Sequence, residues 1–186
     1  MKLINKTNKQ KKGFSLVELL AVLGVGGAMV AGALMLVSDV QEKRAIKTHS
    51  ENISTIYNNM QSLFSSEPVP SAVKMEDLIT AGVFPASMSQ TGTAVKTLAG
   101  GDVTIKSGSS DGFQLLYNKV AVDTCVEILR SQKNVGWDKF DIKKGSADAD
   151  PAGGTVYTGS SIATIASACK TSAAGDDWVS LGFIIN

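Results

Sequence analysis

The sequence predicts an α+β fold, in which one long N-terminal helix precedes a head of antiparallel strands and short helices. Three observations support this prediction. No proline occurs before Pro68, so a helix can run unbroken through the first third of the chain. Apolar residues recur at spacings of three, four and seven between Ile46 and Phe64, which indicates an amphipathic helix. Alternating apolar residues from Val179 to Ile185 predict a final strand with one buried face.

The first half of the predicted helix is apolar on every side. Residues 19–37 contain no charged residue and no Asn, Gln, Ser, Thr or His. About 20 apolar residues are enough for a helix to cross a bilayer, so we expect a transmembrane segment over residues 14–37. Five lysines and no acidic residue precede it in residues 1–13. The positive-inside rule then keeps this basic end in the cytoplasm and places the rest of the chain across the membrane.

The second half of the helix is amphipathic, as expected for a helix that packs on a head along one side. We therefore predict a single helix from about Phe14 to about Phe64. His49 is the only histidine and lies near the apolar stripe. Because the composition offers it no partner ligands, we interpret it as a packing or boundary residue. The stripe consists of Ile46, Ile53, Ile56, Tyr57, Met60, Leu63 and Phe64.

The first part of the head contains one short helix and one predicted hairpin. Two prolines after residue 65 break the long helix, and residues 75–79 predict a short helix that ends at Gly82. Residues 86–100 are rich in Ser, Thr, Gly and Ala and are interpreted as a loop. Strands over residues 103–105 and 113–122, joined by a turn at 107–112, predict an antiparallel hairpin. The strongly apolar final strand is expected to lie in the centre of the sheet.

The two cysteines lie on the apolar faces of two further predicted helices. Thr124 and Glu127 match a capping box that would start a helix carrying Cys125. In the second helix, Cys169 follows three apolar residues at helical spacing, namely Ile162, Ile165 and Ala166. In an exported domain two cysteines indicate one disulfide, Cys125–Cys169, and two buried free thiols are the alternative. Between these helices, Trp137, Phe140 and Ile142 indicate a short strand.

Several classes of function lack support in the sequence. Without its first 13 residues the chain keeps 13 basic and 17 acidic side chains, and no basic patch with interleaved aromatic residues predicts nucleic-acid binding. The chain has no phosphate-binding loop, no zinc-ligand spacing and no nucleophile elbow. With a single histidine we identify no catalytic triad. We therefore predict no catalytic residue, no metal site, no cofactor and no enzymatic activity.

One short motif at the start of the apolar run is more specific. Lys11, Lys12 and Gly13 are followed by Phe14, and residues 15–20 read Ser-Leu-Val-Glu-Leu-Leu. This pattern resembles the class III signal of type IV prepilins, which a prepilin peptidase cuts after the glycine before methylating the next residue. The resemblance implies that cleavage occurs after Gly13 and that Phe14 becomes the N-methylated N-terminus. It also implies that Glu18 acts in assembly, where its carboxylate would meet the Phe14 amine of a neighbouring subunit.

Two alternatives remain for this N-terminal segment. An ordinary secretory signal could be cut after Ala31 or Ala33, and an uncleaved signal-anchor helix would explain the lysines and the apolar run. Both leave Glu18 unexplained, because a charge at the bilayer centre costs about 2.5 to 3.5 kcal/mol, and less near the edge. Such groups usually have a partner.

The resemblance implies a structural subunit of a type IV pilus. The expected organisation is a cleaved leader (1–13), a transmembrane or filament-core helix (14–37) and a pilin head (38–186) that includes a disulfide-bounded region (125–169). The precursor would lie in the inner membrane of a Gram-negative bacterium. After processing it would form a helical homopolymer outside the cell through the pilus assembly machinery. Exposed head surfaces, residues 134–160 among them, would serve adhesion to a host or bacterial surface receptor, or aggregation.

Within the family, the large head, the long segment between the cysteines and the strand after Cys169 resemble the type IVb pilins of thin, toxin-coregulated and bundle-forming pili of enteric bacteria. Two features depart from that subclass: the leader is short, and Phe14 is the usual first residue of type IVa pilins. A pseudopilin of a type II secretion system is the alternative, with Asp176 and Asp177 as a weak calcium-site candidate. A membrane-anchored exported enzyme is the second alternative.

Overall fold

A computed structural model describes residues 15–70, 72–108, 112–144, 155–157, 159–170 and 177–185, with the backbone alone at 33–39 and 155–157. The chain divides into two compact units, Met1–Glu42 and Lys43–Asn186. Helix α1 (Leu16–Leu63) begins in the first unit and ends in the second. Its bounds confirm the predicted long helix to within two residues at either end.

The described part of the first unit is the N-terminal portion of α1. Every side chain from Ser15 to Gly32 is exposed, although most of these residues are apolar. Within the described residues, no helix satisfies the combined requirements of length and apolar character for a membrane span.

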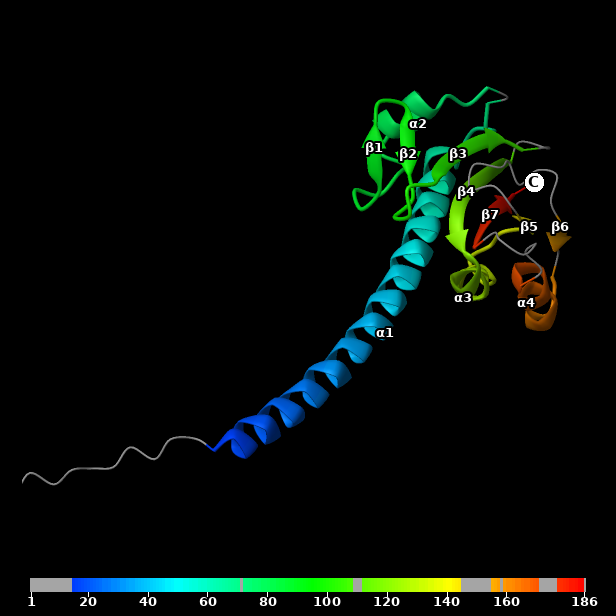
Figure 1. The fold of residues 1–186 in the computed structure, drawn as a ribbon. Coiled ribbons are helices and arrows are strands. Elements are labelled where there is room, and N and C mark those ends of the chain that lie inside the picture. Colours follow the sequence, from blue (N-terminus) through cyan, green and yellow to red (C-terminus); the bar gives the residue numbers. More distant parts are fainter. Residues whose placement is uncertain are drawn as a thin grey trace, which may run out of the picture. The chain divides into compact units, whose positions relative to one another are not determined.

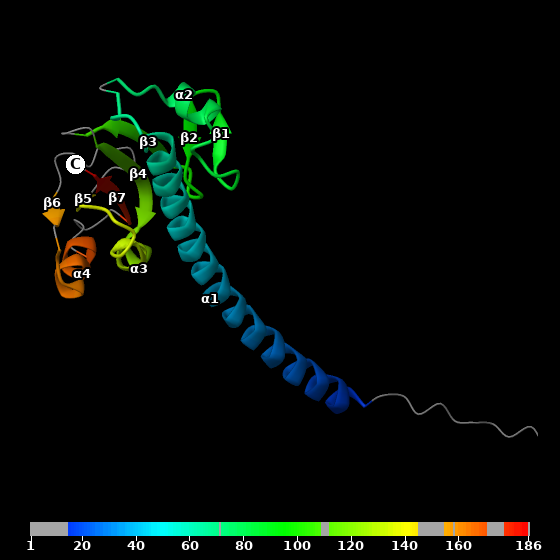
Figure 2. The same ribbon diagram turned by 180° about the vertical axis from the view of Figure 1, so that it is seen from behind.

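The second unit is built on an antiparallel sheet in the order β1-β2-β3-β4-β7-β5-β6 (Figures 1 and 2). The predicted hairpin is present as β3 paired with β4, and the final strand β7 lies between β4 and β5, as predicted. The strands are β1 (Ser89–Thr91), β2 (Ala94–Lys96), β3 (Asp102–Ser107), β4 (Phe113–Ala121), β5 (Lys139–Lys144), β6 (Thr155–Tyr157) and β7 (Trp178–Ile184).

Three short helices complete the described head. Helix α2 (Met75–Thr80) follows the end of α1, and Gly82 adopts the positive φ of 72° that ends it, as predicted. Helix α3 (Val122–Gln132) follows β4 directly, and α4 (Ile162–Lys170) precedes β7 in the sequence. The Cys125–Cys169 disulfide joins α3 to α4, with a Cα–Cα distance of 6.0 Å, and confirms the predicted pairing.

The core forms where one apolar face of the sheet meets the C-terminal part of α1. Both views place this part of α1 beside β3 and β4 (Figures 1 and 2). An aromatic cluster extends the core. The ring of Trp137 packs edge-on against the ring of Tyr57 of α1, with 4.8 Å between the ring centroids, and its centroid lies 5.2 Å from that of Phe183 of β7. Each fully buried large apolar side chain contributes about 1.5 to 3 kcal/mol. The central members are Ile53, Ile56, Met60, Val103, Ile105, Leu115, Tyr117, Val179, Leu181 and Phe183.

Four details differ from the sequence prediction. Residues 86–100 are not all loop, because β1 and β2 form a small antiparallel pair within them. All three β1 side chains are exposed and β2 buries only Val95, so backbone hydrogen bonds form this pair without an alternating apolar pattern.

Leu63 and Ile162 are each 47% exposed and do not belong to the core. Trp137 precedes β5, whereas Phe140 and Ile142 lie in it as predicted.

The predicted start of α3 was also wrong. The helix begins at Val122, with Ala121 as its N-cap residue and no capping bond from Thr124 to the backbone N–H groups. The Val122 N–H donates to the Asp177 carbonyl at 3.1 Å, so a neighbouring segment satisfies the first turn. The Thr124 hydroxyl instead donates to the Ala121 carbonyl at 2.9 Å. A tertiary contact has therefore replaced the local capping box.

We predict that Cys169→Ser lowers the free energy of unfolding of the head by about 2 to 5 kcal/mol, because the bridge closes a long loop in the unfolded chain. Urea unfolding of the full chain in detergent, with Ser160→Ala as a surface control, measures this loss. Thiol labelling of either cysteine in the native chain, without reductant, would contradict the disulfide.

Candidate functional site

The predicted processing and assembly residues lie at the start of the chain. Gly13 and Phe14 are outside the described residues. Glu18 lies in the first turn of α1, where a carboxylate interacts favourably with the helix dipole. Its side chain is exposed and has no ion-pair partner among the described residues. It is therefore available to a cation from another molecule.

The surroundings of Glu18 are apolar and exposed. Leu16, Val17 and Leu19 are each more than half exposed, and a shallow apolar groove on the helix is lined by residues that include Val22, Val25 and Met29. Exposed apolar area costs about 25 cal/mol per Å² in water. This part of the helix therefore gains stability from lipid or from other apolar helices, and the exposed carboxylate next to it must find a partner in either environment.

Glycines are unusually frequent in the same stretch, although the subunit itself does not require them. A Cβ atom added at Gly24, Gly26, Gly27 or Gly32 would meet no described atom within 4 Å. Each glycine lowers helix stability by about 1 kcal/mol relative to alanine. Any packing reason for these glycines therefore lies outside the described subunit.

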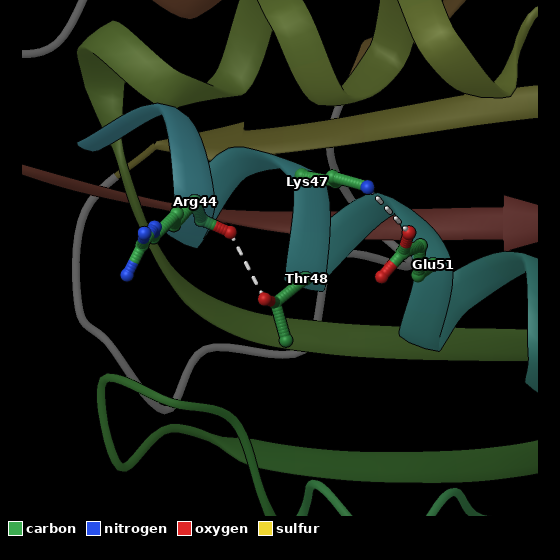
Figure 3. Close-up of polar contacts among 4 residues, drawn as sticks. All are labelled: Arg44, Lys47, Thr48 and Glu51. Carbon is green, nitrogen blue, oxygen red and sulfur yellow. Dashed lines mark hydrogen bonds and ion pairs between the residues drawn. The ribbon is translucent and has the colours of Figure 1, made fainter. Parts of the chain in front are cut away.

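A charged face follows on α1 at the start of the second unit (Figure 3). Lys47 and Glu51 form an ion pair at 3.6 Å with both side chains mostly exposed, and the Thr48 hydroxyl donates to the Arg44 carbonyl at 2.9 Å. An exposed i,i+4 pair contributes about 0.3 to 0.5 kcal/mol. These groups therefore form a solvated helix face and are not a binding site in the isolated subunit.

An adjacent face of α1 is held to the head by polar contacts with α3. Gln132 of α3 is 1% exposed and donates from Nε2 to the Ser50 carbonyl at 3.0 Å and the Ser54 hydroxyl at 3.1 Å. Its Oε1 accepts from Trp137 Nε1 at 3.3 Å. Gln132 was not among the functional residues predicted from the sequence. A polar residue seven positions after Cys125, on the apolar face of α3, was the available signal.

His49 forms the second polar contact between α1 and the sheet. Its Nδ1 lies 2.6 Å from the Tyr117 hydroxyl of β4, and both residues are buried. Burial lowers the pKa of the His49 imidazole. Burial also raises the pKa of the Tyr117 phenol, an effect that the Asn52 side chain partly offsets. His49 is thus a neutral packing residue, in agreement with its interpretation from the sequence.

Two family comparisons identify the chain. A model of the prokaryotic N-terminal methylation motif matches residues 8–34, which include Gly13, Phe14 and Glu18. A model described as PilS N terminal matches residues 43–182, more than half of the chain. The chain belongs to the PilS family of type IV pilins. No curated protein sequence matches the pilin.

Solved structures share the fold of this pilin. The crystal structure of the type IVb pilin from Salmonella typhi has a TM-score of 0.55 and 19% identity, and the match covers 74% of this chain and 97% of that one. TcpA, a type IV pilin from the El Tor biotype of Vibrio cholerae, has a TM-score of 0.56 and 15% identity, with 77% and 99% covered. At these identities the likeness establishes the fold alone.

The family and fold confirm the prediction of a pilus structural subunit. Type IV pilins are processed at their signal motif and assemble with copies of themselves. The motif implies a membrane precursor that becomes part of an extracellular pilus. The family and fold are those of structural pilins and not of enzymes.

We predict that the pilin head loses stability in mild acid because of His49. The unfolded imidazole binds a proton below about pH 6.5, whereas the buried imidazole resists protonation. Above about pH 6.5 the imidazole is neutral in both states, and His49 does not lower the free energy of unfolding. Below about pH 6.5 the free energy of unfolding decreases, by up to about 1.4 kcal/mol for each pH unit. Urea unfolding at about pH 7.5 and about pH 5 measures it. His49→Gln, which keeps a hydrogen-bonding group, should flatten this dependence, and an unchanged slope would contradict the prediction.

Proposed function

We propose that this pilin is cut after Gly13 by a prepilin peptidase, methylated on Phe14 and polymerised into a surface filament. The observation on which the proposal depends is Glu18, an exposed carboxylate without a partner among the described residues, within an apolar helix that matches the methylation motif. A structural role in the subunit does not require this charge. A role in joining two subunits does.

The physical mechanism is an exchange of apolar environments. Before assembly the first half of α1 is held in the inner membrane of a Gram-negative bacterium. In the filament the same helices bundle together, and the assembly machinery transfers each subunit from lipid to the bundle. Leaving lipid costs little because the bundle also excludes water from the apolar side chains. The helices remain covered in both states.

Glu18 sets the register of the bundle in this mechanism. Its carboxylate would pair with the methylated amine of Phe14 on a neighbouring subunit. A buried charge pair contributes little when complete, but the loss of one partner costs about 3 to 5 kcal/mol because the other charge stays buried and unpaired. Subunits in the wrong register therefore leave unpaired charges and are rejected.

The filament would act in adhesion or in aggregation through exposed parts of the heads. Helices α3 and α4, β5 and the residues between them are candidates for this surface, in line with the expectation for residues 134–160. Much of that segment, residues 145–154 included, lies outside the described residues. The receptor would be a molecule on a host cell or on another bacterium.

We predict that the mature pilin begins with N-methylated Phe14. Mass spectrometry of pilin from sheared filaments measures its N-terminus and methylation. Replacement of Gly13 by a bulky residue should cause the precursor to accumulate, while Gly24→Ala, farther along the apolar run, should leave cleavage unchanged. Retention of residues 1–13, or a cut after Ala31 or Ala33, would contradict the proposed processing.

We predict that Glu18→Ala abolishes filaments without reducing pilin level, cleavage or membrane retention. The substitution removes a charge beside the apolar run, so insertion becomes easier, but it leaves the Phe14 amine of the neighbour unpaired in an apolar bundle. Immunoblots measure level and cleavage, and shearing with electron microscopy measures filaments.

Two further variants control for the loss of a charge. Glu18→Asp keeps the carboxylate and should retain more filaments than Glu18→Ala, whereas Glu76→Ala removes an exposed carboxylate from α2 and should assemble normally. Wild-type numbers of filaments from Glu18→Ala would remove Glu18 from the mechanism. Short periplasmic structures in place of surface filaments would favour a pseudopilin.

A further inference from the structure

One edge of the sheet in the head is open at strand β1. In the described part of the chain β1 is the outermost strand and pairs with β2 alone (Figure 1). The side chains of Ser89, Gln90 and Thr91 are all exposed. An open edge presents unpaired backbone N–H and C=O groups, which form a template for pairing with another strand. The head therefore offers a strand-pairing surface at β1.

Gln90 carries the backbone groups that face this open edge. A two-residue turn joins β1 to β2, so Thr91 and Ala94 beside the turn exchange hydrogen bonds with each other. Backbone groups alternate between the two sides of an antiparallel strand, so the N–H and C=O of Gln90 point away from β2. No hydrogen bond from another described segment reaches Gln90. One donor and one acceptor are thus available at the edge.

The usual protections of a sheet edge are absent from β1. Natural proteins protect edge strands with charged residues, prolines, bulges or a covering segment. β1 has no charged residue and no proline, and its register with β2 is continuous from Ser89 to Thr91. Residues 78–95 as a whole contain no charged residue. Only the shortness of β1 limits pairing, because three residues provide few hydrogen bonds.

The core holds β1 in a fixed position. Met88, just before β1, is 4% exposed, and Val95 of β2 is 1% exposed. The Met88 N–H donates to the Pro85 carbonyl at 3.0 Å, and Lys96 of β2 forms an ion pair with Asp102 of β3. The residues on both sides of β1 are thus anchored, while β1 itself is exposed. A partner strand would meet an edge that is already ordered, so pairing loses little conformational entropy.

We propose that β1 joins neighbouring filaments laterally, by pairing with β1 of a second copy of the chain in another filament. The proposal rests on the proposed pilus function and deepens its aggregation part. The two strands would run antiparallel about a two-fold axis at Gln90. The two Gln90 residues would then exchange two backbone N–H···O=C hydrogen bonds, and Ser89 of each copy would lie opposite Thr91 of the other.

The chemistry of β1 favours a second copy of the chain as its partner. Without its first 13 residues the chain keeps 13 basic and 17 acidic side chains, so two filaments of like net charge repel each other. This repulsion is smallest at an uncharged edge. Serine and threonine hydroxyl groups that lie opposite each other on paired strands form hydrogen bonds. The two Gln90 amides can do so as well, because an amide is both donor and acceptor. The β1 strand is therefore complementary to itself.

The shortness of β1 suits a contact between filaments. One β1 pair supplies two backbone hydrogen bonds, which are too few to hold two free subunits together. A filament presents one β1 strand in every subunit, so many pairs form at the same time. Linked contacts can exceed the affinity of a single contact by roughly 10²- to 10⁴-fold. The free subunit is therefore expected to remain monomeric, whereas filaments associate.

The test measures association of purified, sheared filaments by low-speed sedimentation and electron microscopy. Ser89→Lys/Thr91→Lys places like charges opposite each other in the proposed pair, and so does Ser89→Glu/Thr91→Glu. Each variant should form single filaments, with about a tenfold smaller sedimenting fraction than the wild type. A mixture of the lysine and glutamate filaments should form bundles again, because the two kinds of filament then bring opposite charges together.

A backbone variant tests the hydrogen bonds separately. Gln90→Pro removes the N–H that faces the open edge but keeps the β1–β2 pair, which does not use this N–H. It should assemble into filaments that do not bundle, whereas Gln90→Val retains the N–H and should bundle. Thr80→Lys/Ala81→Lys adds two charges at exposed positions at the end of α2 and should also bundle. If Gln90→Pro unfolds, the charge variants remain decisive.

Single filaments from the wild type would overturn the inference. Bundles from Ser89→Lys/Thr91→Lys like those of the wild type would also overturn it, as would a mixture of lysine and glutamate filaments that stays unbundled. Loss of the filaments themselves in both charge variants, at normal pilin level and cleavage, would place β1 in a contact within one filament and contradict the lateral role. A wild-type chain that forms no filaments would instead defeat the pilus function on which the inference rests.

Discussion

The head depends on the burial of one apolar sheet face beneath the C-terminal part of α1. Val103, Leu115 and Leu181 face the same core as Ile53, Ile56 and Met60, and all are almost completely buried. An antiparallel sheet with one apolar face is not stable alone in water, so the helix is a structural part of the head. The polar contacts of His49 and Gln132 add direction to this packing, because His49 of α1 must meet Tyr117 of the sheet and Gln132 of α3 must meet Ser50 of α1.

The same helix has a different requirement in its first half. The head covers the apolar stripe between Ile53 and Met60, but the described side chains of residues 15–32 remain exposed. One continuous helix thus combines a part that is satisfied within the subunit with a part that needs lipid or other copies of the chain. In the proposed mechanism this division gives Glu18, at the exposed end of the helix, a role between subunits and none within the subunit. In the proposed mechanism, assembly depends on what this exposed half contacts.

Features encoded by local periodicity were predictable from the sequence, and features decided by distant contacts were not. The unbroken helix, the β3–β4 hairpin and the central position of β7 all follow from apolar patterns that extend over many residues. The β1–β2 pair has almost no such pattern, since only Val95 among its side chains is buried. Glu18 could be proposed as an assembly residue from the sequence because its charge lies at the border of an apolar run, within a motif that resembles the prepilin signal. The contacts of Gln132 and Tyr117 depend on segments that meet only in the folded chain.

The position of the disulfide has a consequence for the timing of folding during export. Cys125 and Cys169 are both 0% exposed in the folded head, and thiol–disulfide exchange requires access to the attacking sulfur. An oxidant must therefore reach the two thiols before α3 and α4 close over them. The reaction belongs to the interval between emergence of residue 169 from the membrane and completion of the core. A head that completed its core before oxidation would trap its two thiols in the reduced state.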